Sequence, residues 1–165
     1  MRGGWVMRFV GMCLLFLQCA YAQVPQTTNL APAESFLGEQ FCFNAEFSNS
    51  GTPGFGPFYQ MILPPELIFD SATIFGTSAI ISNVGIFPAM PGNQLTDPLI
   101  NQMVTGPEGN SLTILQLPVG SVVSGGPLLQ LQICRTIDPS ATVGVPLDVS
   151  LTPVYQFGDT ATGDN

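Results

Sequence analysis

The chain has 165 residues, eleven of them Asp or Glu and three Arg, with neither histidine nor lysine. The formal net charge of −8 excludes a nucleic-acid-binding protein, which needs basic side chains to displace counterions from phosphates. The missing residue types also exclude histidine zinc sites, histidine general bases, Schiff-base and P-loop lysines, and lysine–asparagine isopeptide crosslinks.

Residues 1–22 have the pattern of a secretory signal peptide. Arg2 and Arg8 precede an apolar run over 9–17, and residues 20–22 supply an Ala-Tyr-Ala cleavage site. The run is shorter than the ~20 residues that a membrane-spanning helix needs, although an uncleaved N-terminal anchor stays an alternative. We therefore expect a secreted, extracellular or cell-envelope protein, with no transmembrane segment in the mature chain.

Residues 23–157 are predicted to form one all-β domain, and 158–165 an acidic linker or the truncated start of a following domain. All 15 prolines follow residue 22, which would break ordinary helices but suits short strands between turns. Alternating polarity and turn residues predict strands over 39–48, 58–63, 67–69, 72–75, 79–87, 99–104, 111–117, 128–137 and 147–157. This number and spacing of strands predicts an antiparallel β-sandwich.

Cys42 and Cys134 are the only cysteines after residue 22, and we expect them to form a disulfide, with two free buried thiols as the alternative. Each cysteine lies on the more polar face of its alternating strand, 39–48 or 128–137. A bond through the core would need both cysteines on the apolar faces. The bond is therefore predicted to join neighbouring strands of one sheet across its outer surface.

Arg135 is the only basic residue after residue 22, and strict alternation puts it on the apolar face of the 128–137 strand. Two explanations are open for this charge. It pairs with a carboxylate at the end of the strand, or a β-bulge shifts its register.

Two groups of residues are weak candidates for ligand binding. Asp159, Asp164 and Asn165 offer the oxygen ligands that calcium prefers, although their spacing does not match an EF-hand loop and a solvated tail is the alternative. Phe55 and Tyr59 flank a glycine-rich turn where exposed rings would stack on a sugar, the alternative being that Phe55 caps the core.

No catalytic residue and no cofactor is predicted. The remaining carboxylates are dispersed along the chain, and none pairs recognisably with another across a cleft as a glycosidase requires. A serine nucleophile would have neither histidine nor lysine to activate it. We therefore expect a protein that is not an enzyme.

Three landmarks give the chain a family resemblance. One strand ends in Asn49-Ser50-Gly51, a second ends in the Leu-Pro-Pro-Glu-Leu corner over 63–67, and a Leu-Pro-Val-Gly turn over 117–120 precedes a further strand. Their order resembles the Ig-like conserved repeat domain of bacterial surface proteins, a family whose function is unknown, over roughly residues 36–157. Glu66 stands where that family usually has glycine, and the stretch 76–110 is longer than its pattern.

The resemblance implies an Ig-like sandwich of about seven to nine strands, with the strands of Cys42 and Cys134 adjacent in one sheet. It also implies a non-catalytic structural or adhesive module of a secreted or cell-envelope bacterial protein. The partners would be neighbouring domains of a longer chain, or molecules at the cell surface. The alternative function is a free-standing secreted domain that binds carbohydrate or calcium.

Overall fold

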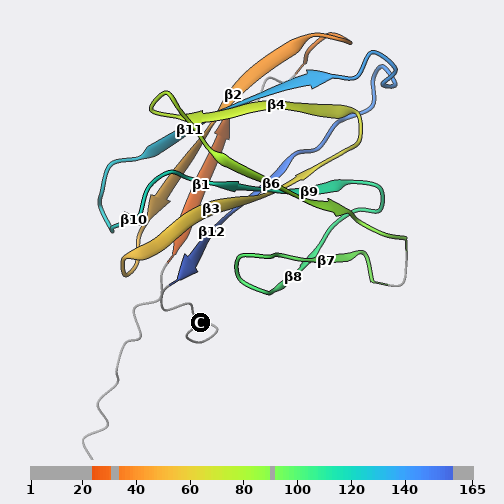
Figure 1. Ribbon diagram of the computed structural model, residues 1–165. Coiled ribbons are helices and arrows are strands. Elements are labelled where there is room, and N and C mark those ends of the chain that lie inside the picture. The colour runs from red at the N-terminus through yellow and green to blue at the C-terminus, as the bar shows by residue number, and fades with distance from the viewer. Residues whose placement is uncertain (1–23, 31–33, 90–91, 158–165) are drawn as a thin grey trace, which may run out of the picture.

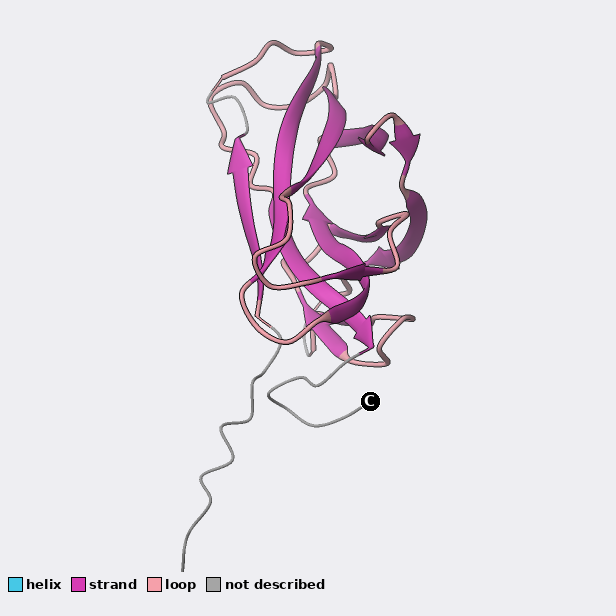
Figure 2. Ribbon diagram, turned by 90° about the vertical axis from the view of Figure 1, so that its left-hand side faces the viewer, coloured by secondary structure: helices cyan, strands magenta, loops and turns pink. Residues whose placement is uncertain are grey.

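The computed structural model describes residues 24–30, 34–89 and 92–157. Within these ranges the chain forms twelve strands and no helix, and every strand pairing is antiparallel (Figures 1 and 2). The predicted all-β antiparallel sandwich is thereby confirmed. The predicted signal peptide over 1–22 and the predicted linker over 158–165 lie outside the described residues.

Sheet A forms one layer of the sandwich, in the strand order β1-β2-β11-β4-β5. Its strands are β1 (Pro25–Leu30), β2 (Gln40–Asn49), β4 (Leu67–Ile74), β5 (Thr77–Ser78) and β11 (Leu129–Ile137). Alternation sets the two faces of β2, because Phe43, Ala45 and Phe47 are buried while the residues between them lie toward solvent. β11 alternates in the same way, so sheet A has one apolar face and one polar face.

Sheet B forms the second layer around β3, which pairs with β9 and with β12 and, near its start, with β10. β6 pairs with the far side of β9. The strands of this sheet are β3 (Gly54–Leu63), β6 (Ile80–Ile86), β9 (Ser111–Gln116), β10 (Ser121–Val122) and β12 (Ser150–Phe157). β3 and β9 are buried on both faces, since the consecutive residues Phe58 and Tyr59 are each fully buried.

A hairpin of β7 (Gln94–Thr96) and β8 (Met103–Thr105) covers the outer face of sheet B. It encloses a second apolar cluster with Phe58, Phe87 and other residues of sheet B. Buried Asp97 fixes the hairpin, because its carboxylate accepts hydrogen bonds from the Gln60 side chain at 2.7 Å and from the Leu99 N–H at 2.8 Å. The long stretch 76–110 thus supplies a cover for the sheet.

The strand count differs from the seven to nine strands that the resemblance implied. Four of the twelve strands, namely β5, β7, β8 and β10, have only two or three residues each. The strand expected over 99–104 is wrong for its first four residues, which form the turn between β7 and β8. There the Asn101 N–H donates to the Asp97 carbonyl at 2.9 Å, which closes the turn.

β1 begins and β12 ends at the same end of the sandwich. The Ser50 N–H donates to the Val24 carbonyl at 3.2 Å, and Phe157 pairs with Phe55, so both Val24 and Phe157 lie beside the connection from β2 to β3. The connection over 138–149, between β11 and β12, lies at the opposite end (Figure 1).

An aromatic cluster packs the core near the end that holds Val24 and Phe157. The Phe47 ring meets the rings of Tyr59 and Tyr155 edge-on, with centroids 5.3 and 5.4 Å apart. The Tyr59 hydroxyl shares a 3.1 Å hydrogen bond with the hydroxyl of Thr27. Burial raises the pKa of Tyr59 to about 12, and burial raises the pKa of Tyr155 to about 12 as well.

The two buried phenols make stability sensitive to alkaline pH. Unfolded tyrosines ionise near pH 10, whereas the native phenols keep their protons up to pH 12, so their contribution is complete below pH 10 and lost as pH rises to 12. In a chain lacking residues 1–22, these are the only tyrosines. We expect tyrosinate absorbance to rise together with the loss of the β-sheet circular dichroism signal. Tyrosinate absorbance near pH 10 in a protein that is still folded would contradict this.

Candidate functional site

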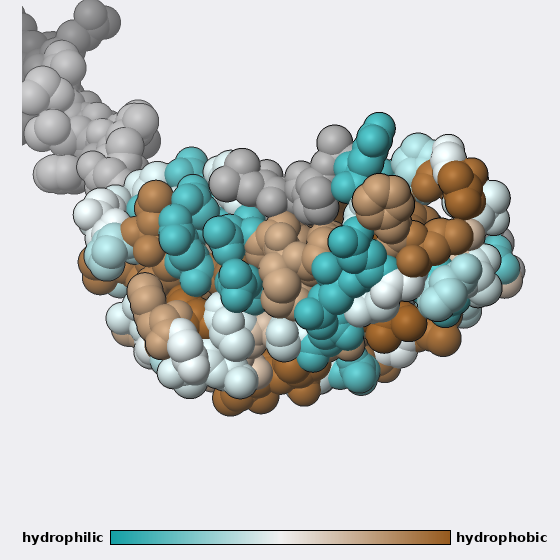
Figure 3. Space-filling model, turned by 90° about the horizontal axis from the view of Figure 1, so that it is seen from above, coloured by the Kyte–Doolittle hydropathy of each residue, from teal (hydrophilic) through white to brown (hydrophobic). Residues whose placement is uncertain are grey.

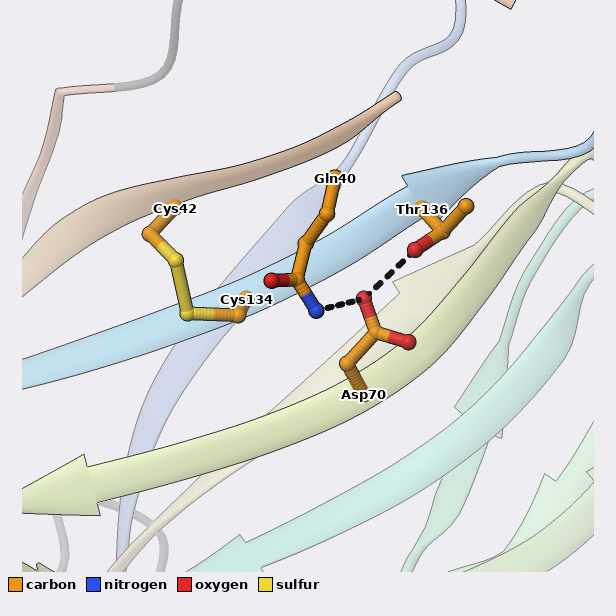
Figure 4. The surroundings of a disulfide bond; sticks show 5 residues. All are labelled: Gln40, Cys42, Asp70, Cys134 and Thr136. Carbon is orange, nitrogen blue, oxygen red and sulfur yellow. Dashed lines mark hydrogen bonds between the residues drawn. A yellow bond between two sulfur atoms is a disulfide. The ribbon is translucent and has the colours of Figure 1, made fainter. Parts of the chain in front are cut away.

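Cys42 and Cys134 lie directly opposite each other on the neighbouring strands β2 and β11 (Figure 4). They form a disulfide with a Cα–Cα distance of 4.1 Å, on the outward face of sheet A. Both the predicted bond and its predicted place across the outer surface of one sheet are confirmed. The cysteines are 92 residues apart, so the closed loop contains β3 to β10 and most of sheet B.

Polar side chains surround the disulfide on the outer face of sheet A. The Asp70 carboxylate accepts hydrogen bonds from the Gln40 side chain at 3.0 Å and from the Thr136 hydroxyl at 2.8 Å, which links β4, β2 and β11 (Figure 4). Gln130 likewise donates to the Glu46 carboxylate at 3.1 Å across β11 and β2. Figure 3, which looks down on the molecule from above, shows hydrophilic side chains over the middle of this surface.

Arg135 lies on the opposite, inward face of β11 and is fully buried. Its guanidinium is 3.9 Å from the centre of the Phe69 ring, and its Nη2 donates to the sulfur of Met61 in sheet B. The other two nitrogens, Nε and Nη1, have no hydrogen-bond partner among the described residues. Burial lowers the pKa of Arg135 to about 9, against the opposing charge of Asp70, so the side chain still carries its charge at neutral pH.

Neither explanation offered for Arg135 accounts for its position. The predicted carboxylate partner is not found in the described part of the chain, and the Asp70 carboxylate is instead bonded to Gln40 and Thr136 on the outer face. The register between β11 and β4 does shift between Cys134 and Arg135, as a bulge would make it. That shift nevertheless leaves Arg135 facing the core, where a charge is costly.

A groove opens at the end of the sandwich away from Val24 and Phe157. One wall is the segment 34–36 before β2, and the other is the segment 143–149 that leads into β12. Its volume is about 630 Å³, and its floor consists of inward-facing side chains of sheet A: Phe41, Phe43, Leu67 and Ile137. The groove therefore gives access to the edge of the core between the sheets.

The walls of this end groove carry exposed apolar side chains. Phe36 and Val143 are 79% and 80% exposed, and Val145 is also exposed. A smaller hollow of about 200 Å³ continues the groove and shares Phe36 and Val143 with it. In Figure 3 apolar side chains gather toward the right-hand end of the molecule, where Figure 1 places the 138–149 connection.

Carboxylates lie in and beside the first wall of the groove. Glu34 is part of the lining, and the Glu39 carboxylate accepts hydrogen bonds from the Ser35 hydroxyl and from the Phe36 N–H, each at 3.3 Å. Asp148 stands between the lining residues Leu147 and Val149 but is not itself part of the lining. Among the described residues the only cation is Arg135, which is buried, so no exposed cation offsets the carboxylates near the groove.

The two aromatic candidates do not share a surface. Tyr59 is fully buried between the sheets, in the aromatic cluster, and its hydroxyl is bonded to Thr27. Phe55 is half exposed at the start of β3, where it pairs with Ser121 of β10. The sugar-stacking surface expected from the two rings together is therefore not formed.

The calcium candidates Asp159, Asp164 and Asn165 lie outside the described residues. In 24–30, 34–89 and 92–157, no three histidine, cysteine or acidic side chains are grouped so as to hold a metal ion. These ranges also contain no helix long and apolar enough to cross a membrane.

The groove is the feature that sequence reasoning missed. Residues 143–149, Val-Gly-Val-Pro-Leu-Asp-Val, were expected partly as the start of a strand over 147–157, but β12 begins only at Ser150. The sequence does contain a signal for this loop. Gly and Pro interrupt the segment, and its apolar residues cannot all lie on one buried face of a strand. Such a segment indicates an apolar loop that covers the core incompletely.

The fold and its covalent bond define the chain as an antiparallel β-sandwich domain with a disulfide between two adjacent strands in the interior of one sheet. Comparison of the sequence with protein-family models finds no match, and comparison with curated proteins finds none either.

Replacing Arg135 by an apolar residue of similar length should stabilise the domain. Arg135→Met removes a buried charge with two unbonded nitrogens, and we expect the free energy of unfolding at neutral pH to rise by about 1–4 kcal/mol. Arg135→Lys keeps a charge at this position and serves as the matched control, which should show no gain. Chemical denaturation of both variants measures the effect, and a loss of stability in Arg135→Met would show that the guanidinium is favourable where it lies.

Proposed function

We propose that this chain is a non-catalytic structural or adhesive module of a secreted or cell-envelope protein, as its resemblance to the Ig-like conserved repeat domain implies. The observation that carries the proposal is the disulfide between β2 and β11. Disulfides form and persist in oxidising compartments, which agrees with the signal-peptide pattern over 1–22. A covalent bond inside the sheet also suits a domain that must stay folded without the protection of the cell.

The position of Val24 and Phe157 favours an adhesive role over that of an in-line spacer. Segments of a longer chain joined at these two residues would both attach at one end of the sandwich. The domain would then project from its neighbours, with the groove at the far end. A spacer that adds length to a stalk would instead have its two attachment points at opposite ends.

Removing the disulfide tests whether it has a structural role. The closed loop of 92 residues predicts that Cys42→Ala/Cys134→Ala loses about 4 kcal/mol of unfolding free energy, because its unfolded chain is less restricted. For a domain of this size the melting temperature should fall by roughly 10–15 °C. The control is Asn44→Ala/Gln132→Ala, which changes a directly opposed and exposed pair on the same two strands.

A melting temperature that is unchanged in the cysteine variant, or lowered equally in the control, would contradict the structural role of the bond. Reduction of the wild-type protein should reproduce the effect of the cysteine variant.

Export is tested separately with the complete chain expressed in a bacterium. We expect mass spectrometry of the exported fraction to find a mature protein that begins at Gln23, with Cys42 and Cys134 oxidised. Full-length protein retained in the cytoplasm with reduced cysteines would overturn the proposed location. A melting temperature raised by calcium or by a glycan would support the alternative, a secreted ligand-binding domain.

A further inference from the structure

We infer that the end groove, between residues 34–36 and 143–149, docks an extended polypeptide segment of a partner protein that carries apolar side chains flanked by Lys or Arg. The inference rests on the proposed function, since it names the surface through which an adhesive module would act.

The apolar part of the argument comes from the walls and the floor. Phe36, Val143 and Val145 expose apolar side chains next to one another, and the floor reaches the core of the sandwich. Contiguous exposed apolar surface that is bordered by polar residues is a mark of interaction sites. The volume of about 630 Å³ is within the ~300–1,000 Å³ range of ligand-binding clefts, enough for a few large side chains.

The charge around the groove determines which partner fits. Glu34 lines the groove, Glu39 accepts a hydrogen bond from the Phe36 N–H, and Asp148 stands between two lining residues of the other wall. No exposed cation is present among the described residues. Lysine or arginine side chains flanking the apolar contacts would therefore meet complementary charge at the rim. A second copy of this chain would bring further carboxylates and no lysine, and an anionic membrane surface would be repelled in the same way.

Hydrogen bonds fix the turn after the first wall and the turn that leads into the second wall before any partner arrives. The Gly38 N–H donates to the Ile137 carbonyl at 2.8 Å, which fixes the turn after the first wall onto β11. On the other side, the Asp138 N–H donates to the Glu66 carbonyl at 2.8 Å, and the Ala141 N–H closes a turn onto Asp138 at 3.0 Å. A preformed groove spares a partner the cost of ordering the loops on binding.

Three fluorescently labelled octapeptides test the two chemical requirements separately: alternating valine and lysine, alternating valine and glutamate, and alternating serine and lysine. We expect the valine–lysine peptide to bind at least about tenfold more tightly than either of the others in fluorescence anisotropy titrations, and more weakly as salt is added. NMR shifts of the protein should map to the walls of the groove. No binding, equal binding of the glutamate peptide, or shifts located elsewhere would overturn the inference.

Paired variants locate the binding surface. Val143→Ser/Val145→Ser should lower the affinity for the valine–lysine peptide at least about fivefold, while Ile80→Ser/Ile86→Ser, a pair equally exposed on β6, should leave it unchanged. Glu34→Gln/Asp148→Asn should weaken binding and flatten its salt dependence, with Glu46→Gln on the outward face of β2 as the control. Equal effects of the groove variants and their controls would overturn the inference.

The failure of the groove and the failure of the proposed function can be told apart. If the valine–lysine peptide does not bind while the protein is exported and its disulfide stabilises it as expected, only the docking inference fails. If the peptide binds but Cys42→Ala/Cys134→Ala keeps its full stability, the structural role of the bond fails and the groove stands. A stable dimer detected by light scattering and abolished by Val143→Ser/Val145→Ser would assign the groove to a second copy and overturn the inference.

Discussion

The pairing of β2 with β11 is the constraint on which the rest of the sandwich depends. A shift of one residue in this register would turn every side chain of one strand to the wrong face, burying polar residues and exposing phenylalanines. The bond between Cys42 and Cys134 removes that possibility, because it joins two directly opposed residues. The same register pairs Arg135 with Phe41 and leaves the Arg135 side chain facing the core. The register that buries the apolar face of the sheet therefore also buries the charge of Arg135.

The core is consequently packed unevenly along the sandwich. At the end that holds Val24 and Phe157, the rings of Tyr59 and Tyr155 meet the Phe47 ring edge-on, and no charged group is buried among them. Toward the other end lie the guanidinium of Arg135 and, beyond it, the floor of the groove. Burying an unpaired charge costs free energy, while the disulfide and the aromatic cluster contribute in the opposite direction.

The sequence predicts this fold best where one face of a strand is buried and the other is exposed to solvent. Buried and exposed residues alternate clearly along β2 and β11. This alternation predicts the two faces of the sheet, the outward position of the disulfide and the inward position of Arg135. Prediction fails where a third element covers a strand or where a short strand carries few apolar side chains. Tyr59 lies on a strand buried on both faces, so its neighbouring glycines falsely indicated an exposed ring, and β1 has too few apolar residues to show alternation. The groove depends on loops distant in sequence, which no local pattern brings together.

Val24 and Phe157 lie at the same end of the sandwich, which is not the arrangement expected of a domain that adds length to a tandem array. Tension between Val24 and Phe157 would pull at one end of the sandwich, where β1 peels from β2 and β12 peels from β3 one hydrogen-bonded pair after another. Bonds loaded in this sequence resist less than bonds loaded all at once along the strands. The disulfide would then limit how far the chain extends, because the roughly 90 residues between Cys42 and Cys134 lie inside the covalent loop and cannot be stretched by the tension. If the proposed adhesive role holds, a module built in this way would present the surface at its far end, where the groove lies, and would carry little load along the chain.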